Sequence, residues 1–275
     1  MTEDTTTIQR PGTFPPEVNQ AVPSRARIHD YLLGGDASFE VDRSAADFVA
    51  MAVPGVREGM RASRGFLQRA VRYLAGEGQV SQFLDIGSGL PTQGNVHEIA
   101  QSVNPRAQVV YADNDPSVVC YAQILLSGAP DTVSYIEADL REPAAILAHP
   151  SVTRALDLSR PAAIILTGVL QFLEDSDQPL EKVETLRAAL APGSYLVLTQ
   201  ATADPAASPE TASAFGQAVT ATSTRQREHI LRFFDGLELL EPGLVEPGDW
   251  RPDGQQGQRA AGGAARPLAG VAIRR

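Results

Sequence analysis

The stretch Val-Ser-Gln-Phe-Leu-Asp-Ile-Gly-Ser-Gly-Leu-Pro-Thr, residues 80–92, decides the fold. It reads as an apolar strand that ends at Asp85 and is followed at once by a turn containing Gly87 and Gly89. The first glycine lets the chain turn sharply, and the second lets the backbone approach a ligand closely, because neither carries a Cβ. A helix that follows such a turn presents free N–H groups and the positive end of its dipole. The pattern predicts a nucleoside-cofactor site at the end of a parallel strand.

The same turn indicates which cofactor binds. A dinucleotide site has the pattern Gly-x-Gly-x-x-Gly, whereas the third position here is Thr92. S-adenosylmethionine has no phosphate and does not require that third glycine. Asp85, two residues before the first glycine, would orient the turn and help hold the ammonium group of the cofactor. These residues favour S-adenosylmethionine over a dinucleotide.

Alternating strands and helices begin at residue 80. Asp85, Asp113 and Asp139 stand at or near strand ends and are 28 and 26 residues apart, the length of one βα unit. We therefore expect the three carboxylates to lie side by side at the carboxyl edge of the sheet. Parallel strands are expected at 80–86, 107–112, 133–138, 162–167 and 194–200.

The side chains at these strand ends suit an adenosine. The Asp113 carboxylate can accept both ribose hydroxyls, and Asn114 would line the adenosine pocket. Asp115 is expected to cap the next helix. Asp139 would accept the adenine amino group while Leu140 contacts the ring edge; the alternative is that Asp139 caps a helix.

The end of the fourth strand would face the sulfonium through Thr167 and Gly168. The Asn/Asp-Pro-Pro-aromatic motif of amino-methyltransferases that modify bases is absent there, which argues against DNA methylation. His29 lies near a glycine pair and could reach the mouth of the cofactor site, whereas His97 is expected to be structural. No spacing of His, Asp and Glu predicts a metal site.

Composition limits the class of protein. The chain has 275 residues, of which 43% are apolar, enough for one large α/β domain with an appendage. The net charge of −10 argues against non-specific nucleic-acid binding. The single cysteine, Cys120, excludes an internal disulfide. No apolar run reaches the roughly 18 residues of a membrane span, and the polar N-terminus is unlike a signal peptide. We therefore expect a cytoplasmic protein; its oligomeric state is not predicted.

The chain divides into three parts. Residues 1–23 are expected to form a disordered tail, residues 24–78 an N-terminal helical cap, and residues 79–275 a Rossmann-like S-adenosylmethionine-binding domain. Helices are predicted from Ser24, as N-cap, to Gly34 and Gly35, and then over 43–51 and 57–75. Strands at 237–240 and 268–273, joined across a loop at 251–266, would form an antiparallel pair at the sheet edge. The predicted fold is the class I methyltransferase fold, a mostly parallel seven-stranded α/β sheet.

Several segments resemble an actinobacterial S-adenosylmethionine-dependent methyltransferase-like family, long known as a domain of unknown function. The resemblance covers roughly residues 24–275 and implies a class I fold and cofactor binding, but no substrate. Two positions depart from the family, which often has Tyr at position 29 and His at position 171, where this chain has His29 and Gln171. Gln171 can hydrogen-bond an acceptor but cannot take its proton. The segments that carry the resemblance are 27–35, 82–92, 95–98, 111–116, 139–141, 192–196, 233–237 and 250–253.

The leading hypothesis is methyl transfer from S-adenosylmethionine to a small-molecule acceptor. The acceptor site would be formed by residues 31–43 and by the loops after the fourth and fifth strands, with Gly34 beside the cofactor. Candidate catalytic residues are Tyr31, Arg43, Gln171 and Gln200. One alternative is a non-catalytic regulatory protein that binds S-adenosylmethionine or S-adenosylhomocysteine. The other is a nicotinamide-dependent oxidoreductase, which Thr92 and the lack of a catalytic Lys/Tyr or His pair disfavour.

Overall fold

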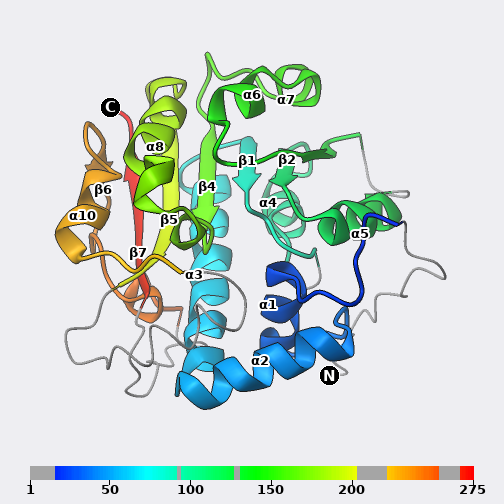
Figure 1. The fold of residues 1–275 in the computed structure, drawn as a ribbon. Helices are drawn as coiled ribbons and strands as arrows, with labels where there is room; N and C mark the ends of the chain where they lie inside the picture. The colour runs from blue at the N-terminus through cyan, green and yellow to red at the C-terminus, as the bar shows by residue number, and fades with distance from the viewer. Residues whose placement is uncertain (1–15, 92–93, 127–130, 203–221, 254–266) are drawn as a thin grey trace.

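The computed structural model describes residues 16–91, 94–126, 131–202, 222–253 and 267–275. Within them a seven-stranded sheet runs in the order β3-β2-β1-β4-β5-β7-β6 (Figure 1). The first five strands in the chain are parallel, and β7 is antiparallel to both β5 and β6. This is the predicted class I architecture. The strands are β1 (Gln82–Ile86), β2 (Gln108–Asp113), β3 (Val133–Glu137), β4 (Ala163–Thr167), β5 (Tyr195–Ala201), β6 (Glu238–Leu239) and β7 (Pro267–Ile273).

Every strand begins and ends within two residues of its prediction, and the last two form the expected antiparallel pair. The predicted tail at 1–23, the loop at 251–266 and Thr92 fall largely or wholly outside the described residues.

The central strands are apolar on both faces because helices cover both sides of the sheet. Side chains alternate along a strand, so Leu84 and Ile86 of β1 enter one core cluster while Phe83 enters the other. The first cluster includes residues of α6 (Pro143–Ala148), α7 (Pro150–Ala155), α8 (Pro179–Ala188) and α10 (Arg227–Arg232). The second includes residues of α3 (Val56–Gly76) and α4 (Val96–Val103). α5 (Pro116–Leu126) packs through Val118 and Tyr121 near Tyr135 of β3. Short 3₁₀ turns are η1 (Leu170–Phe172), η2 (Asp175–Asp177) and η3 (Pro247–Asp249).

The first helix, α1 (Arg25–Leu33), has the ends that the sequence predicts. The Ser24 hydroxyl accepts a hydrogen bond from the Arg27 N–H, and Gly34 stops the helix in the left-handed conformation at φ +96°. The second helix, α2 (Glu40–Ala52), starts three residues earlier than predicted. The reason is the Asp42 carboxylate, which accepts the Phe39 N–H at 2.8 Å and caps the helix from inside its first turn.

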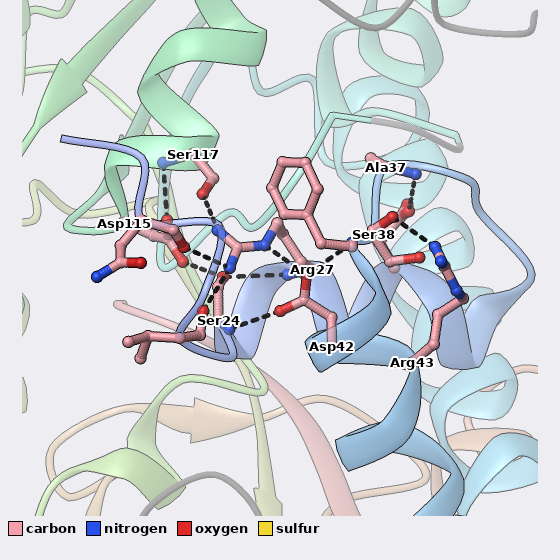
Figure 2. A network of polar contacts seen from close by, with 12 residues as sticks. Ser24, Arg27, Ala37, Ser38, Asp42, Arg43, Asp115 and Ser117 are labelled. Atoms are coloured by element: carbon pink, nitrogen blue, oxygen red, sulfur yellow. Dashed lines mark hydrogen bonds and ion pairs between the residues drawn. The ribbon is translucent and has the colours of Figure 1, made fainter. Parts of the chain in front are cut away.

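A buried ion pair fastens α1 and α2 to the sheet domain (Figure 2). Arg27 Nε lies 2.7 Å from Asp42 Oδ2, and both side chains are almost fully buried. Arg27 Nη1 also donates to Ser117 Oγ at 2.5 Å, and the Ser24 hydroxyl donates to Asp115. Because Asp115 and Ser117 belong to the start of α5, these contacts join the N-terminal helices to the segment that follows β2.

Asp42→Ala should destabilise the protein by about 3–5 kcal/mol, because it leaves the buried Arg27 guanidinium without its counter-charge. Asp47→Ala, on the exposed side of the same helix, should cost less than about 1 kcal/mol, although Asp47 pairs with Arg57 at 3.3 Å. Denaturant unfolding followed by circular dichroism measures both. Equal losses for the two variants would show that the buried pair does not hold the helix.

The described helices include none that is long and apolar enough to cross a membrane.

Candidate cofactor and acceptor site

A hollow of about 880 Å³ opens at the carboxyl edge of the sheet. Its walls come from α1, the first half of α3 and the ends of β1 to β5. A smaller hollow, about 680 Å³, lies by the start of β1 and β2 at the opposite edge, beside Ser81 and Gln108. Ligands of open α/β sheets bind outside the carboxyl ends of the strands, so the larger cavity is the candidate site.

The glycine turn forms the floor of this cavity. Gly87 and Gly89 both have positive φ, +71° and +66°, which L-residues rarely adopt. A Cβ at position 87 would lie 2.3 Å from a methyl carbon of Val169, whereas one at 89 would meet nothing within 4 Å. Gly87 is therefore required by packing as well as by conformation, and Gly89 by conformation alone.

The Asp113 carboxylate faces the cavity at the end of β2. Oδ2 accepts the Gly89 N–H at 2.8 Å and Oδ1 accepts the Asp115 N–H at 3.0 Å. Burial raises the pKa of Asp113 to about 6, although these two N–H groups favour the ionised form. An ionised carboxylate has about four acceptor positions, so the group keeps capacity for further hydroxyl donors.

Asp139 and Asn114 form a second polar pair in the cavity wall. Asp139 accepts hydrogen bonds of 2.8 Å from Asn114 Nδ2, from Arg141 N and from Arg141 Nη1. Burial alone would raise the pKa of Asp139, but these donors hold it below its usual value. The alternative role as a helix cap is wrong, because α6 begins at Pro143 with Glu142 as N-cap.

The end of β4 contributes the residues predicted there. Thr167 and Gly168 line the cavity, as does Leu140 after β3. Gly168 has φ +71°, and its N–H donates to Thr199 Oγ1 at 2.9 Å. That bond ties the turn after β4 to β5.

Asp85 lies behind the cavity wall. It is buried, it does not line the cavity, and its Oδ1 has no hydrogen-bond partner among the described residues. Burial raises the pKa of Asp85 to about 7, against the opposing effect of the nearby Arg64 guanidinium. A direct contact with a ligand is therefore not supported by this geometry, which leaves Asp85 a role in the charge balance behind the turn.

Arg64 is a site residue that the sequence analysis missed. It lines the cavity, and the described structure gives it no hydrogen bond, although Asp85 and Asp30 are within electrostatic range. A signal was present in α3, since Met60, Arg64, Leu67 and Val71 share one helical stripe. A cation in an otherwise apolar stripe marks a position that faces something polar.

α1 contributes two further residues. The Arg25 guanidinium stacks 4.4 Å from the centroid of the Phe172 ring, and both residues line the cavity, as does Gln171. His29 lines it too, as predicted; burial, reinforced by Arg64, lowers its pKa to about 4, so the imidazole is neutral at physiological pH. His97 has the structural role expected of it, with Nδ1 2.8 Å from the Tyr111 hydroxyl.

Besides Asp85, four predicted site residues do not line the cavity: Tyr31, Gly34, Arg43 and Gln200. The cavity face of α1 runs from Arg25 to His29, and Gly34 ends the helix away from it.

The other three side chains have structural partners. Tyr31 packs under the Arg57 guanidinium, and Arg43 donates to the Ser38 carbonyl at 2.8 Å. Gln200 is buried; its amide donates to the Ser223 carbonyl at 2.8 Å and accepts from Arg225.

The sequence analysis also did not predict the role of Arg225 beside the cavity. Its guanidinium donates to the carbonyls of Leu170 and Leu173, at 3.0 and 2.8 Å, and so holds the turn that carries Gln171 and Phe172. Gln200 and Arg225 thus position the cavity wall without entering the cavity.

Sheet order, glycine turn and edge carboxylates define the class I methyltransferase fold. The sequence matches the profile of the S-adenosyl methyltransferase family over residues 11–275, and the chain belongs to this family. It is a methyltransferase, as the leading hypothesis predicted.

Solved structures of other proteins share this fold. A candidate methyltransferase from Thermobifida fusca YX is 40% identical, with a TM-score of 0.85 over 95% of this chain and 98% of that one. A DUF574 family protein from Streptomyces avermitilis MA-4680 is 38% identical, with a TM-score of 0.86 over 93% of this chain and 99% of that one. An O-methyltransferase family protein from Burkholderia thailandensis shares the fold, with 14% identity and a TM-score of 0.52 over 86% of this chain and 60% of that one. No curated protein matches the chain.

The two turn glycines give a test of this geometry. Gly87→Ala should destabilise the protein by about 2–5 kcal/mol, since it combines left-handed strain with the collision at Val169. Gly89→Ala should cost only about 1–2 kcal/mol, from the backbone conformation alone. Unfolding midpoints in denaturant compare the two. A loss at position 89 as large as that at 87 would contradict the described turn.

Proposed function

We propose that S-adenosylmethionine binds in the carboxyl-edge cavity, with adenosine over β2 and β3 and the methionyl group toward α3, and donates its methyl group to a small-molecule acceptor. One observation carries the proposal. The cavity holds a buried carboxylate with free acceptor positions, Asp113, and a cation without a hydrogen bond among the described residues, Arg64. The ribose hydroxyls and the carboxylate of the cofactor are the groups that these side chains would complement.

At the adenosine end the chain supplies acceptors and a preset geometry. Asp113 would accept the ribose hydroxyls, and the Gly89 and Asp115 N–H groups keep its carboxylate in place. Asp139 retains one acceptor position for the adenine amino group, since three donors already occupy the others. Leu140 and Asn114 would complete the adenine wall.

At the methionyl end Arg64 would pair with the carboxylate, with Gly87 and Gly89 below it and Thr167 and Gly168 beside the sulfur. The sulfonium supplies an already electrophilic methyl group. The residues of the chain therefore have to align the acceptor and exclude water more than they have to activate the donor. The N-terminal helices, within residues 24–78, would form a cap that excludes water from the bound cofactor and acceptor.

Isothermal titration calorimetry with S-adenosylhomocysteine tests the adenosine end. We expect micromolar affinity that is constant above about pH 7 and falls by up to tenfold per pH unit below about 6, as Asp113 becomes protonated and loses acceptor positions. Asp113→Asn should bind at least about tenfold more weakly and lose that part of the pH dependence. Any dependence that persists in this variant belongs to other groups, such as Asp85. Asp235→Asn, on the surface, is the control, and undiminished affinity in Asp113→Asn would contradict the assignment.

Two ligands, one with and one without the methionyl carboxylate, test the proposed contact of Arg64. Arg64→Met should weaken S-adenosylhomocysteine binding by about 10- to 100-fold, through loss of a charge-assisted contact. Binding of 5′-methylthioadenosine, which lacks the carboxylate, should change by less than about threefold. Arg61→Met on the exposed side of α3 controls for the substitution. Equal losses for both ligands would place Arg64 outside the methionyl contact.

A further inference from the structure

The cavity extends past the proposed cofactor contacts toward the first turns of α3. There Val56, Gly59 and Met60 face the ends of β5 and the start of β7, represented by Ala201, Thr202 and Pro267. These six residues define an acceptor chamber. Its two walls are close, because a Cβ built on Gly59 would lie 4.0 Å from Pro267 Cδ, and Pro267 pairs with Ala201 in the sheet.

None of the six described residues that define the acceptor chamber is charged. The acids among the described lining residues are Glu17, Asp113, Asp115 and Asp139. The three aspartates follow β2 and β3, and the chamber lies beyond β1 on the other half of the sheet, at β5 and β7. Glu17 is in the segment whose carbonyls, at Asn19 and Val22, are bound by Arg27 beside α5. Arg64 stands one turn along α3 from Met60, and among the nearby charged groups Asp85 has the largest effect on its pKa.

An ion in such a chamber would lose its hydration without gaining a counter-charge, which is strongly unfavourable. At neutral pH an aliphatic amine is a cation and a carboxylic acid is an anion. A hydroxyl compound enters uncharged. Thr222 offers it a partner, since this residue lines the cavity and its buried hydroxyl oxygen has no hydrogen-bond partner among the described residues.

Gly59 points to the same conclusion. Glycine is the least favourable helix residue apart from proline, yet it stands buried in the first turns of a 21-residue helix. Neither sterics nor backbone conformation requires it, because the nearest atom to an added Cβ is at ordinary contact distance and its φ is not positive. A side chain longer than alanine would be blocked by Pro267 and would have to enter the cavity. Because residue 59 has no side chain, the volume that a side chain would fill belongs to the acceptor chamber.

We propose that the methyl acceptor is an uncharged, largely apolar hydroxyl compound that lies against Gly59 in the acceptor chamber, with its hydroxyl near Thr222; this rests on the proposed cofactor site. Methylation forms one carbon–oxygen bond as the methyl carbon–sulfur bond breaks, leaves S-adenosylhomocysteine, and releases the hydroxyl proton to solvent.

The test uses three probes of one shape on protein saturated with S-adenosylhomocysteine: 2-naphthol, 2-naphthoate and 2-naphthylmethylammonium. Calorimetry at neutral pH should give binding of 2-naphthol, and affinities at least about tenfold lower for the two ions. Gly59→Leu should reduce 2-naphthol affinity by about tenfold or more while S-adenosylhomocysteine affinity stays within about twofold. Gly76→Leu, at the exposed end of the same helix, should leave both affinities unchanged.

Thr222→Val tests the hydroxyl contact separately. It should weaken 2-naphthol binding by about three- to tenfold and leave 2-methylnaphthalene binding unchanged. The inference is overturned if either ion binds as tightly as 2-naphthol, if Gly59→Leu leaves 2-naphthol binding intact, or if no 2-naphthol binds to the loaded protein. Failure of the wild-type protein to bind S-adenosylhomocysteine would instead overturn the proposed cofactor site.

Discussion

The hydrogen bonds of the Asp113 carboxylate are the constraint on which the site depends. One oxygen holds the Gly89 N–H of the turn after β1, and the other holds the Asp115 N–H at the start of α5. A single buried carboxylate thereby fixes two neighbouring βα connections at the same edge of the sheet. Because the group is buried and carries a raised pKa, its ionised form is poised to gain from further donors in the cavity.

The same constraint reaches the N-terminal helices. Asp115, which Asp113 positions, caps α5 through the Ser117 N–H and accepts the Ser24 hydroxyl at the start of α1. The ion pair between Arg27 and Asp42 then joins α2 to α1 beside the start of α5 (Figure 2). Ligand contacts at Asp113 and the placement of α1 over the cavity are therefore parts of one hydrogen-bonded network.

The sequence predicted the sheet closely because its signals were local. β1 to β4 each end at or just before an acid or a glycine turn, and Ser24 and Gly34 mark the ends of α1 by their own chemistry. Side-chain direction was less predictable, since it depends on contacts distant in the chain. Tyr31 and Arg43 lie in a segment that the sequence placed at the acceptor site, yet neither lines the cavity: Tyr31 in α1 packs under Arg57, and Arg43 in α2 donates to the Ser38 carbonyl.

Gln200 ends a parallel strand as a ligand residue would, but its partners, Ser223 and Arg225, come from a segment some 25 residues later. Arg64 differs, because a cation within an apolar helical stripe was visible in the sequence itself. The resulting site is divided, with charged groups over β2 and β3 and at Arg64, and an uncharged chamber over β5 and β7. Such a division suits an enzyme whose donor carries the charge and whose acceptor carries none.

The most direct test of this account is a crystal structure of the complex with S-adenosylhomocysteine. We predict the ribose hydroxyls within hydrogen-bond distance of both Asp113 oxygens, the carboxylate at the Arg64 guanidinium, and the sulfur beside Gly168, facing the acceptor chamber. A ligand bound in the reverse direction, or at the opposite edge of the sheet, would contradict it.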